Sequence, residues 1–261
     1  MSVMKSKFVA FSSLVLALSA TVPAVSRADD EPAWGPFTAN IALTSDYRFR
    51  GQSQSQGEPA VSGGIDYTGD SGFFAGVWAS NVDFNDAAET YLEVDLYAGF
   101  TAALSDKTTG TIKAVYYWYP TADYPPLANE NDYFELIGIL AHDFGGFSGT
   151  LEVAWSPDYF LESGSSVELA GGLSVPITDK LWFFDGGVSA SGRVGYQWID
   201  ENATFGTPDY VFYDIGLSAK VANVTLDLRW VDTDLSRPDC FGGTNLCEGG
   251  VVATLALLLP G

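Results

Sequence analysis

The sequence is poor in basic residues and in the residue types that most enzymes need. Its 261 residues include 12 lysines and arginines against 33 acids, with one histidine and two cysteines. A net charge of −21 would repel phosphates, so we expect no nucleic-acid partner. No stretch approaches 18 consecutive apolar residues, which excludes a helical membrane protein. The sequence is still compatible with an exported or envelope protein that is not built from membrane-spanning helices.

The first 28 residues have the composition of an export signal. Lys5 and Lys7 make a basic start, an apolar run follows from Phe8 to Val22, and small residues precede the end of the segment at Ala28. We expect residues 1–28 to be cleaved as a signal peptide, leaving a single domain over residues 29–261. Cleavage removes three bases and no acid, so the exported chain is still more acidic.

Residues 37–51 alternate between two chemical types. One set is apolar or aromatic apart from Ser45, and the other is polar and includes Asp46, Arg48 and Arg50. Side chains of a strand point alternately to opposite faces, so the pattern predicts a strand with one oily and one wet face. Thirteen residues would span roughly 43 Å, enough for a tilted crossing of a bilayer. We therefore predict a transmembrane β-strand that continues to Phe49, with Ser45, Tyr47 and Phe49 on the lipid side.

Eleven more strands are predicted, and the connections between them alternate in length. The predicted strands cover residues 60–68, 73–81, 91–102, 111–119, 133–141, 147–155, 166–175, 181–198, 210–220, 224–233 and 250–259. Connections near 51–59, 82–90, 120–131, 156–165, 199–209 and 234–249 are long. Those near 69–71, 142–146, 176–180 and 221–223 are short, and 103–110 is intermediate. Short periplasmic turns and long outer loops are typical of an all-β, antiparallel up-and-down outer-membrane barrel of about 12 strands.

Two aromatic patterns qualify this prediction. Residues 73–81 carry large side chains on both faces, because Phe74 and Trp78 oppose Phe73 and Val77, so the orientation of that strand stays open. Four aromatic residues follow one another at positions 116–119, and we interpret them as part of an interfacial girdle.

Cys240 and Cys247 lie seven residues apart in a turn-rich segment without histidine. An exported protein meets an oxidising compartment, so a disulfide is favoured over a metal site. We predict a Cys240–Cys247 bridge, no metal and no cofactor.

Enzyme chemistry finds little support. A lipase-like barrel needs a histidine close to its serine, but His142 lies beside a short turn, and GxSxG, P-loop and HExxH motifs are absent from the sequence. Glu93 and Asp95 share one strand face and could suggest acid–base catalysis, but in a barrel that face is the wet lumen. We expect no enzyme.

Several segments, in this order, resemble the TorF-type porins of proteobacteria. They are SDYRFRGQSQ (45–54), PAVSGGIDY (59–67), GFFAGVWASNVDF (72–84), YLEVDLYAGF (91–100), YYWYP (116–120), WSPDYF (155–160), VGYQW (194–198) and VDTDL (231–235). The resemblance covers nearly the whole exported chain. It implies an outer-membrane channel and brings neither a substrate nor agreed site residues.

Alternation also predicts which charges face the lumen. The inward set is Asp46, Arg48, Arg50, Asp66, Glu93, Asp95, Lys113, Glu135, Glu152, Glu168, Asp185, Arg193, Asp214, Lys220, Asp227 and Arg229. Such charges need hydration or pairing, so the lumen is either a hydrated pore or an interior plugged by salt bridges. Twelve strands do not decide between them.

These observations lead to one functional hypothesis and one alternative. We expect a channel in the outer membrane of a Gram-negative bacterium, contacting lipid and passing small hydrophilic solutes or ions with a modest cation preference. Its candidate pore-lining residues are Asp46, Arg48, Arg50, Glu93, Asp95, Glu135, Arg193 and Arg229. Periplasmic chaperones and the barrel assembly machinery would be transient partners. The alternative is a non-conducting barrel whose outer loops bind a partner or a surface.

Overall fold

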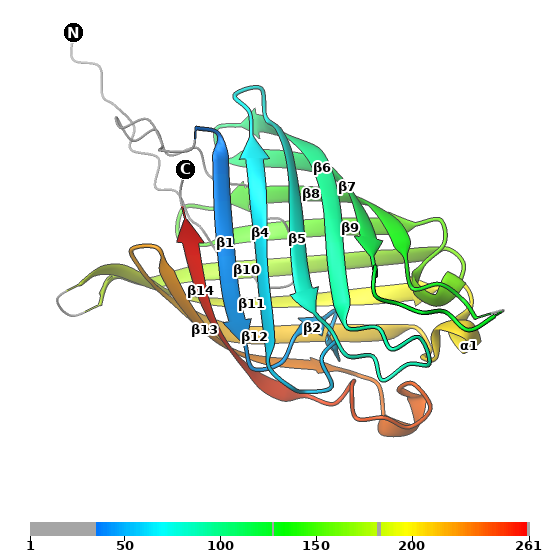
Figure 1. Ribbon diagram of the computed structural model, residues 1–261. Helices are drawn as coiled ribbons and strands as arrows, with labels where there is room; N and C mark the ends of the chain where they lie inside the picture. Colours follow the sequence, from blue (N-terminus) through cyan, green and yellow to red (C-terminus); the bar gives the residue numbers. More distant parts are fainter. Residues whose placement is uncertain (1–34, 127, 182–183, 260–261) are drawn as a thin grey trace, which may run out of the picture.

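Twelve antiparallel strands close into one barrel in the computed structural model, which describes residues 35–126, 128–181 and 184–259 (Figure 1). β1 (Phe37–Thr44) pairs with β4 (Ala60–Thr68) on one side and with β14 (Gly250–Leu259) on the other. Closure leaves the barrel sheet without an open edge. The predicted fold class is confirmed. The predicted signal peptide lies outside the described residues.

The remaining barrel strands follow the chain around the cylinder. They are β5 (Phe73–Asn81), β6 (Leu92–Ser105), β7 (Thr108–Trp118), β8 (Tyr133–Asp143), β9 (Ser148–Ser156), β10 (Ser166–Leu181), β11 (Phe184–Ile199), β12 (Tyr210–Val221) and β13 (Val224–Thr233). Three single-turn helices, η1 (Phe160–Glu162), α1 (Asn202–Phe205) and η2 (Arg237–Asp239), lie in the connections. None of the described helices is long and apolar enough to cross a membrane.

All six long connections lie at one end of the barrel, which we call the loop end (Figure 1). They are loop 1 (45–59), loop 2 (82–91), loop 3 (119–132), loop 4 (157–165), loop 5 (200–209) and loop 6 (234–249). Short turns, including residues 69–72, 106–107, 144–147 and 222–223, lie at the opposite, turn end. The predicted alternation is confirmed. The connection predicted at 103–110 is tighter than expected, because β6 and β7 extend to within two residues of each other.

The barrel wall has an apolar outer face and a polar inner face. Ile65, Ile215 and Leu228 are each more than half exposed on the outside, although they are large aliphatic residues. On the inside, Glu93, Asp95 and other charged residues are almost fully buried. This is the reverse of a water-soluble protein, and an apolar belt of this extent is stable only against lipid or another apolar phase.

The first strand is shorter than the alternation predicted. β1 ends at Thr44, and the chain then leaves the wall, so Tyr47 and Phe49 pack inside the barrel and not on the lipid side. The reason lies in the pairing: Thr44 is already opposite Ala60 of β4, so the wall is complete without the residues between them. Alternation within residues 45–49 reflects a separate short hairpin.

A turn predicted at residues 176–180 is also wrong. β10 continues through Pro176 to Leu181, with register shifts relative to β11 at Pro176/Thr178 and Thr178/Lys180. Bulges accommodate a proline that lacks an amide hydrogen, so a turn-like composition is compatible with a strand here. Residues 182–183 and the side chain of Asp185 lie outside the described residues.

The structure shows which aromatic residues of β5 and of residues 116–119 face the lumen and which face outward. On β5, Phe74 is buried inside the barrel while Phe73 and Val77 are exposed. In the aromatic run at residues 116–119, Tyr116 and Trp118 are exposed and fit the predicted girdle, whereas the neighbouring Tyr117 and Tyr119 are buried in the lumen. The girdle prediction is therefore correct for two of the four residues.

Candidate functional site in the barrel lumen

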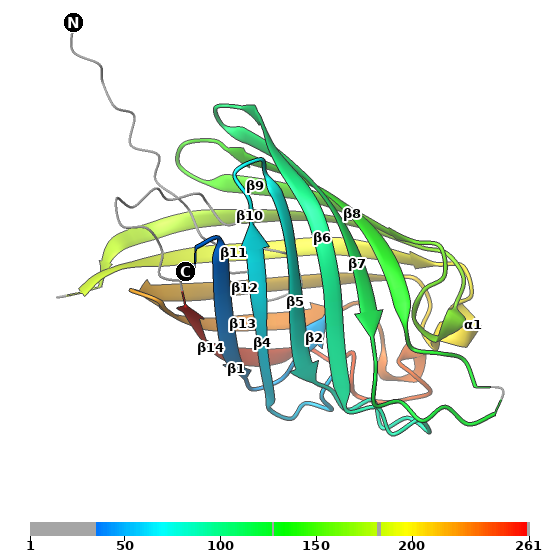
Figure 2. The same ribbon diagram turned by 45° about the horizontal axis from the view of Figure 1, so that its top comes forward.

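Loop 1 folds into the lumen as a small hairpin, which we call the loop-1 hairpin. It consists of β2 (Arg48–Phe49) and β3 (Gln52–Ser53), which pair only with each other in a sheet separate from the barrel. Figures 1 and 2 place β2 within the cylinder, near the loop end. The loop-1 hairpin is thus attached to the wall only through its two connecting ends and its side-chain and loop contacts.

The turn of the hairpin requires an unusual backbone. Arg50 and Gly51 both have positive φ, +47° and +85°, as in the primed two-residue turns of β-hairpins. A Cβ at Gly51 would come within 2.4 Å of Thr233 and 2.9 Å of the carbonyl of Asp232. Only glycine fits there. Arg50 adopts a conformation that non-glycine residues rarely occupy, and its side-chain contacts must offset the cost.

Arg50 makes a buried ionic cluster with two strands of the wall. Its Nη1 and Nη2 donate to the two carboxylate oxygens of Glu135 on β8, at 2.8 and 3.0 Å, and its Nε donates to Glu168 on β10 at 2.6 Å. Nη1 also lies 3.1 Å from the hydroxyl of Tyr159 in loop 4. The Arg50 side chain is 3% exposed and both carboxylates 1%. The guanidinium therefore connects the loop-1 hairpin to two wall strands and to loop 4.

The charge of Arg50 is secured by its partners. Loss of hydration alone would lower its pKa, but the carboxylates of Glu135 and Glu168 outweigh this, and the pKa is raised well above its ordinary value. A buried arginine remains charged in any case, so removing either carboxylate leaves an uncompensated cation. The ion pairs thus fix the hairpin in the lumen.

The base of the hairpin is held by a second polar cluster. Asp46 accepts hydrogen bonds from Arg48 Nε and from Ser53 Oγ, both at 2.6 Å. Arg48 Nη1 also donates to the carbonyls of Gly51, at 3.0 Å, and of Glu248 in loop 6, at 2.7 Å. Asp46 and Arg48 thus organise the hairpin itself and attach it to loop 6.

Loop 6 supports the hairpin through a short disulfide-bonded segment. Cys240 and Cys247 form the predicted bridge, with Cα atoms 5.9 Å apart. Within the bridged segment, the carbonyl of Leu246 accepts from the amide of Ser53 at 2.8 Å. Immediately after it, Glu248 accepts from Arg48.

Removing the disulfide should loosen this support. Closing so short a loop contributes about 2.5 kcal/mol in the chain-entropy model. In the Cys240→Ser/Cys247→Ser variant we expect faster proteinase K cleavage within loop 6, with the barrel still folded by gel mobility. Equal cleavage rates in the oxidised wild type and this variant would contradict a supporting role for the bridge.

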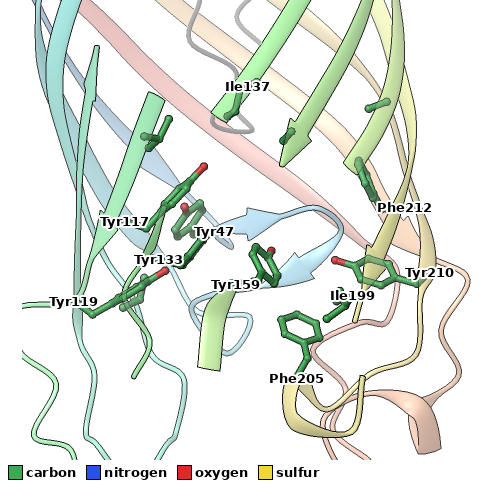
Figure 3. Packing of buried hydrophobic residues seen from close by; sticks show 14 of the residues in the cluster. Tyr47, Tyr117, Tyr119, Tyr133, Ile137, Tyr159, Ile199, Phe205, Tyr210 and Phe212 are labelled. Carbon is green, nitrogen blue, oxygen red and sulfur yellow. The ribbon is translucent and has the colours of Figure 1, made fainter. Parts of the chain in front are cut away.

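Aromatic side chains fill the space around the hairpin. Figure 3 shows the rings of Tyr117, Tyr133 and Tyr159 beside it in the lumen. Tyr117 and Tyr133 stack at 4.2 Å between centroids, and Phe49 of the hairpin contacts the edge of Tyr117 at 5.9 Å. The lumen at this level is packed like a protein core.

The long loops extend this aromatic packing toward the loop end. Phe84 from loop 2, Tyr119 from loop 3, Phe160 from loop 4, Phe205 from loop 5 and Phe241 from loop 6 form a continuous series of ring contacts, with centroids 5.2 to 6.5 Å apart. Five loops therefore meet through aromatic contacts at the loop end.

Further charged residues form a layer along the wall. Arg193 on β11 pairs with Glu152 at 2.8 Å and also with Glu168, so Glu168 bridges Arg193 and Arg50. Glu93 accepts hydrogen bonds from the hydroxyls of Tyr47 (2.9 Å) and Tyr119 (3.2 Å). Burial, followed by the charge of Glu93, raises the pKa of Tyr47 well above its ordinary value, so this phenol stays protonated and can donate.

The eight candidate pore residues fall into three places. Arg50, Glu135 and Arg193 belong to one ionic network, and Glu93 and Asp95 face the lumen nearby on β6. Asp46 and Arg48 lie at the base of the hairpin. Arg229 is separate: it pairs with Asp214 and with Asp227, and donates to Ser191. Their role in a pore stays a prediction.

Some important residues were missed as site residues. Glu168 was assigned only to the inward set, and Tyr159 and Gly51 were not identified. One feature of the sequence could have indicated the hairpin. The predicted first strand has thirteen residues, more than most of the other predicted strands, and its extra residues are those that lead into the hairpin. Which wall residues the hairpin would reach could not be read from the pattern.

His142 lies far along β8 from this network, toward the turn end, with Nδ1 2.8 Å from Oγ1 of Thr108. Among the described residues, no group of three or more histidine, cysteine or acidic side chains is arranged to hold a metal ion.

Comparison with known proteins places the chain among bacterial barrels. Residues 30–257 match the family described as "Bacterial protein of unknown function (Gcw_chp)". No curated protein sequence matches. Two similar solved structures are the KdgM porin, with a TM-score of 0.53 and 7% identity over 85% of this chain and 98% of that one, and the NanC porin, with 0.51 and 10% over 86% and 99%. At such identities the likeness concerns the fold, which is that of outer-membrane porins.

Proposed function

Because the chain belongs to the bacterial Gcw_chp family, whose function is unknown, we propose from its own structure that it is an outer-membrane channel for small hydrophilic solutes. In the resting state the loop-1 hairpin plugs the channel near its outer end. This function agrees with the resemblance to TorF-type porins, which stays a prediction.

One observation carries the proposal: the barrel wall is complete without the plug. β1 pairs with β4 as far as Thr44 and Ala60, and the hairpin shares no strand pairing with the wall. The hairpin can therefore leave the lumen without breaking any barrel ladder.

The inner wall is suited to water and ions once the hairpin has left. Among the described residues of the inner wall on β6 to β11, Glu93, Asp95, Glu135, Glu152 and Glu168 outnumber the two bases, Lys113 and Arg193. An acidic excess in a hydrated pore attracts cations and disfavours anions. We therefore retain the modest cation preference in the proposal.

The setting of the proposed channel follows from its surface. The apolar belt would contact lipid in the outer membrane of a Gram-negative bacterium, with the loop end outside and the turn end in the periplasm. Export through a cleaved signal peptide, with periplasmic chaperones and the barrel assembly machinery as transient partners, completes this proposal.

A non-conducting barrel is the second candidate, and a specific observation favours it. The aromatic series from five loops and the buried ion pairs of Arg50 would also suit a permanently sealed barrel whose loops bind a partner. The two candidates differ in one measurable property, ionic current.

The test compares wild-type protein with Arg50→Ala in planar lipid bilayers. Removing the guanidinium takes from Glu135 its ion-pair partner and leaves Glu168 with Arg193 alone, which disfavours the plugged state by roughly 2 kcal/mol or more, about a 30-fold rise in open probability. We expect brief, rare current steps in the wild type and frequent ones in Arg50→Ala. In a salt gradient the reversal potential should shift toward the equilibrium potential of the cation.

Arg237→Ala is the matched control. Arg237 also pairs with a glutamate, Glu248, at 2.7 Å, but both side chains are about half exposed, and such pairs contribute little. Its open probability should equal that of the wild type. Absence of current from Arg50→Ala in protein shown to be folded by gel mobility and circular dichroism would reject the channel and support the sealed barrel.

A further inference from the structure

The wall groups that hold Arg50 form a guanidinium-shaped site of their own. Glu135 lies on β8, Glu168 on β10 and Tyr159 in loop 4, so none of them belongs to the hairpin. Together they accept four hydrogen bonds from one guanidinium, two of them from the paired Nη atoms to a single carboxylate. This fork-to-fork arrangement is the strongest and most selective way to bind the group.

The site is held in place independently of Arg50. The hydroxyl of Tyr117 donates to Oε2 of Glu135 at 3.0 Å, and Arg193 pairs with the other oxygen of Glu168. Both carboxylates are therefore oriented by neighbours on the wall. The ring of Tyr159 adds a cation–π contact, with its centroid 5.8 Å from Cζ of Arg50. Because Tyr159 belongs to loop 4, its ring stays available to another cation when the hairpin leaves.

Two buried side chains near the site have acceptor oxygens that receive no hydrogen bond. Asp95 is fully buried, its carboxylate oxygens accept no hydrogen bond, and its electrostatic neighbours are Glu93, Lys113 and Glu135. Gln197 is also fully buried with Oε1 unpartnered, and its register places it directly opposite Glu168. Unsatisfied buried acceptors are rare, because each costs free energy. They offer acceptors to a cation larger or richer in N–H groups than the arginine side chain.

We propose that Glu135, Glu168 and Tyr159 form a binding site for small solutes that carry a guanidinium group, and that Arg50 occupies it as a tethered substitute when the barrel is plugged. The inference rests on the proposed channel in that it names the class of solute. A soluble guanidinium compound would compete with Arg50 for the site and so favour withdrawal of the hairpin.

The chemistry discriminates against other cations. An ammonium group has three donors around one nitrogen and cannot span both oxygens of Glu135 and Oε2 of Glu168 in one plane. Urea has the planar shape of guanidinium but no charge, so its hydrogen bonds to the carboxylates lack the ion-pair attraction and are weaker. Methylguanidinium, methylammonium and urea are therefore the matched probes.

The primary test is calorimetric and needs no current. Methylguanidinium is titrated into folded, detergent-solubilised Arg50→Ala, in which the tethered group is absent. We expect binding at least ~10-fold tighter than to Arg50→Ala/Glu135→Gln/Glu168→Gln, and at least ~10-fold tighter than that of methylammonium or urea. Equal affinities for the two variants, or for the three probes, would overturn the proposal.

A second measurement uses a barrel that keeps Arg50, in case Arg50→Ala does not fold. Gln52 is buried in the hairpin and its Nε2 has no partner, so Gln52→Cys should fold. A thiol reagent should label this cysteine slowly, and ~20 mM methylguanidinium should accelerate labelling several-fold while urea at the same concentration does not. A labelling rate indifferent to methylguanidinium would contradict competition with Arg50.

Failure of the site and failure of the channel give different results. Selective binding without current in bilayers supports the guanidinium site and rejects the channel. Current from Arg50→Ala that methylguanidinium neither blocks nor carries, together with no calorimetric binding, supports the channel and rejects the site.

Discussion

A barrel that lacks the loop-1 hairpin should conduct steadily. In this variant an Asn-Gly pair replaces residues 45–59 and joins Thr44 directly to Ala60, its partner in the β1–β4 register. Asn-Gly is the favoured sequence for a two-residue hairpin turn, so both strands and the wall should be preserved. All the ion pairs and ring contacts of the plug are lost at once.

The expected effect exceeds that of any single substitution. Breaking a buried ion pair costs roughly 3–5 kcal/mol, and here the element that carries it is gone, so the open fraction should rise ~100-fold or more over the wild type. Single-channel recording measures it, and cation selectivity follows from the reversal potential in a salt gradient. Strand content and heat-modifiable gel mobility should match the wild type. A folded variant that stays silent would show that the lumen is closed by something other than loop 1.

Leu228→Arg should prevent stable insertion of the barrel. Leu228 lies at the middle of β13, is 54% exposed, and faces outward beside Leu217 and Ala253 of the adjacent strands. An arginine on the lipid face costs about 2–4 kcal/mol at the bilayer midplane. The free energy of unfolding from lipid vesicles in a urea titration should fall by about this amount, and the yield of folded protein with it.

Two controls isolate the cause. Leu228→Ala removes apolar area without adding a charge. Its free energy of unfolding should fall clearly less than that of Leu228→Arg. Ser189→Arg introduces the same side chain on the lumen face of β11. Ser189 lies four residues before the inward-facing Arg193 and therefore on the same face of the strand, so this variant should insert normally. A loss from Ser189→Arg as large as that from Leu228→Arg would show that the assignment of faces is wrong.

Most of the wall was predictable because strand alternation is a local property. In β6, Glu93, Asp95 and Tyr97 alternate with apolar residues. The structure buries Glu93 and Asp95 in the lumen and half-buries Tyr97, while Leu96 and Phe100 are exposed on the outside. The sorting of long and short connections gave the number and direction of the strands. Predictions were wrong where a local pattern has two structural solutions, as at Pro176, where a bulge and a turn share the same composition.

The candidate site was predicted only in part. Asp46, Arg48 and Arg50 were selected for their polarity and position, yet all three lie in loop 1 and not in β1. Glu135 and Arg193 were placed on the inner face but could not be assigned partners. Arg50 is 85 residues from Glu135 and 118 from Glu168, and no period along the chain encodes such a contact.

The sequence by itself determined the closed barrel, its inside and outside, the ends at which its loops lie, and the disulfide. Each of these depends on periodicity, spacing or compartment, which are properties of neighbouring residues. Only the tertiary structure decided that loop 1 turns inward and that Arg50 fills a site built from β8, β10 and loop 4. That outcome depends on which strands curve to face one another across the lumen, and such proximity arises only when the cylinder closes.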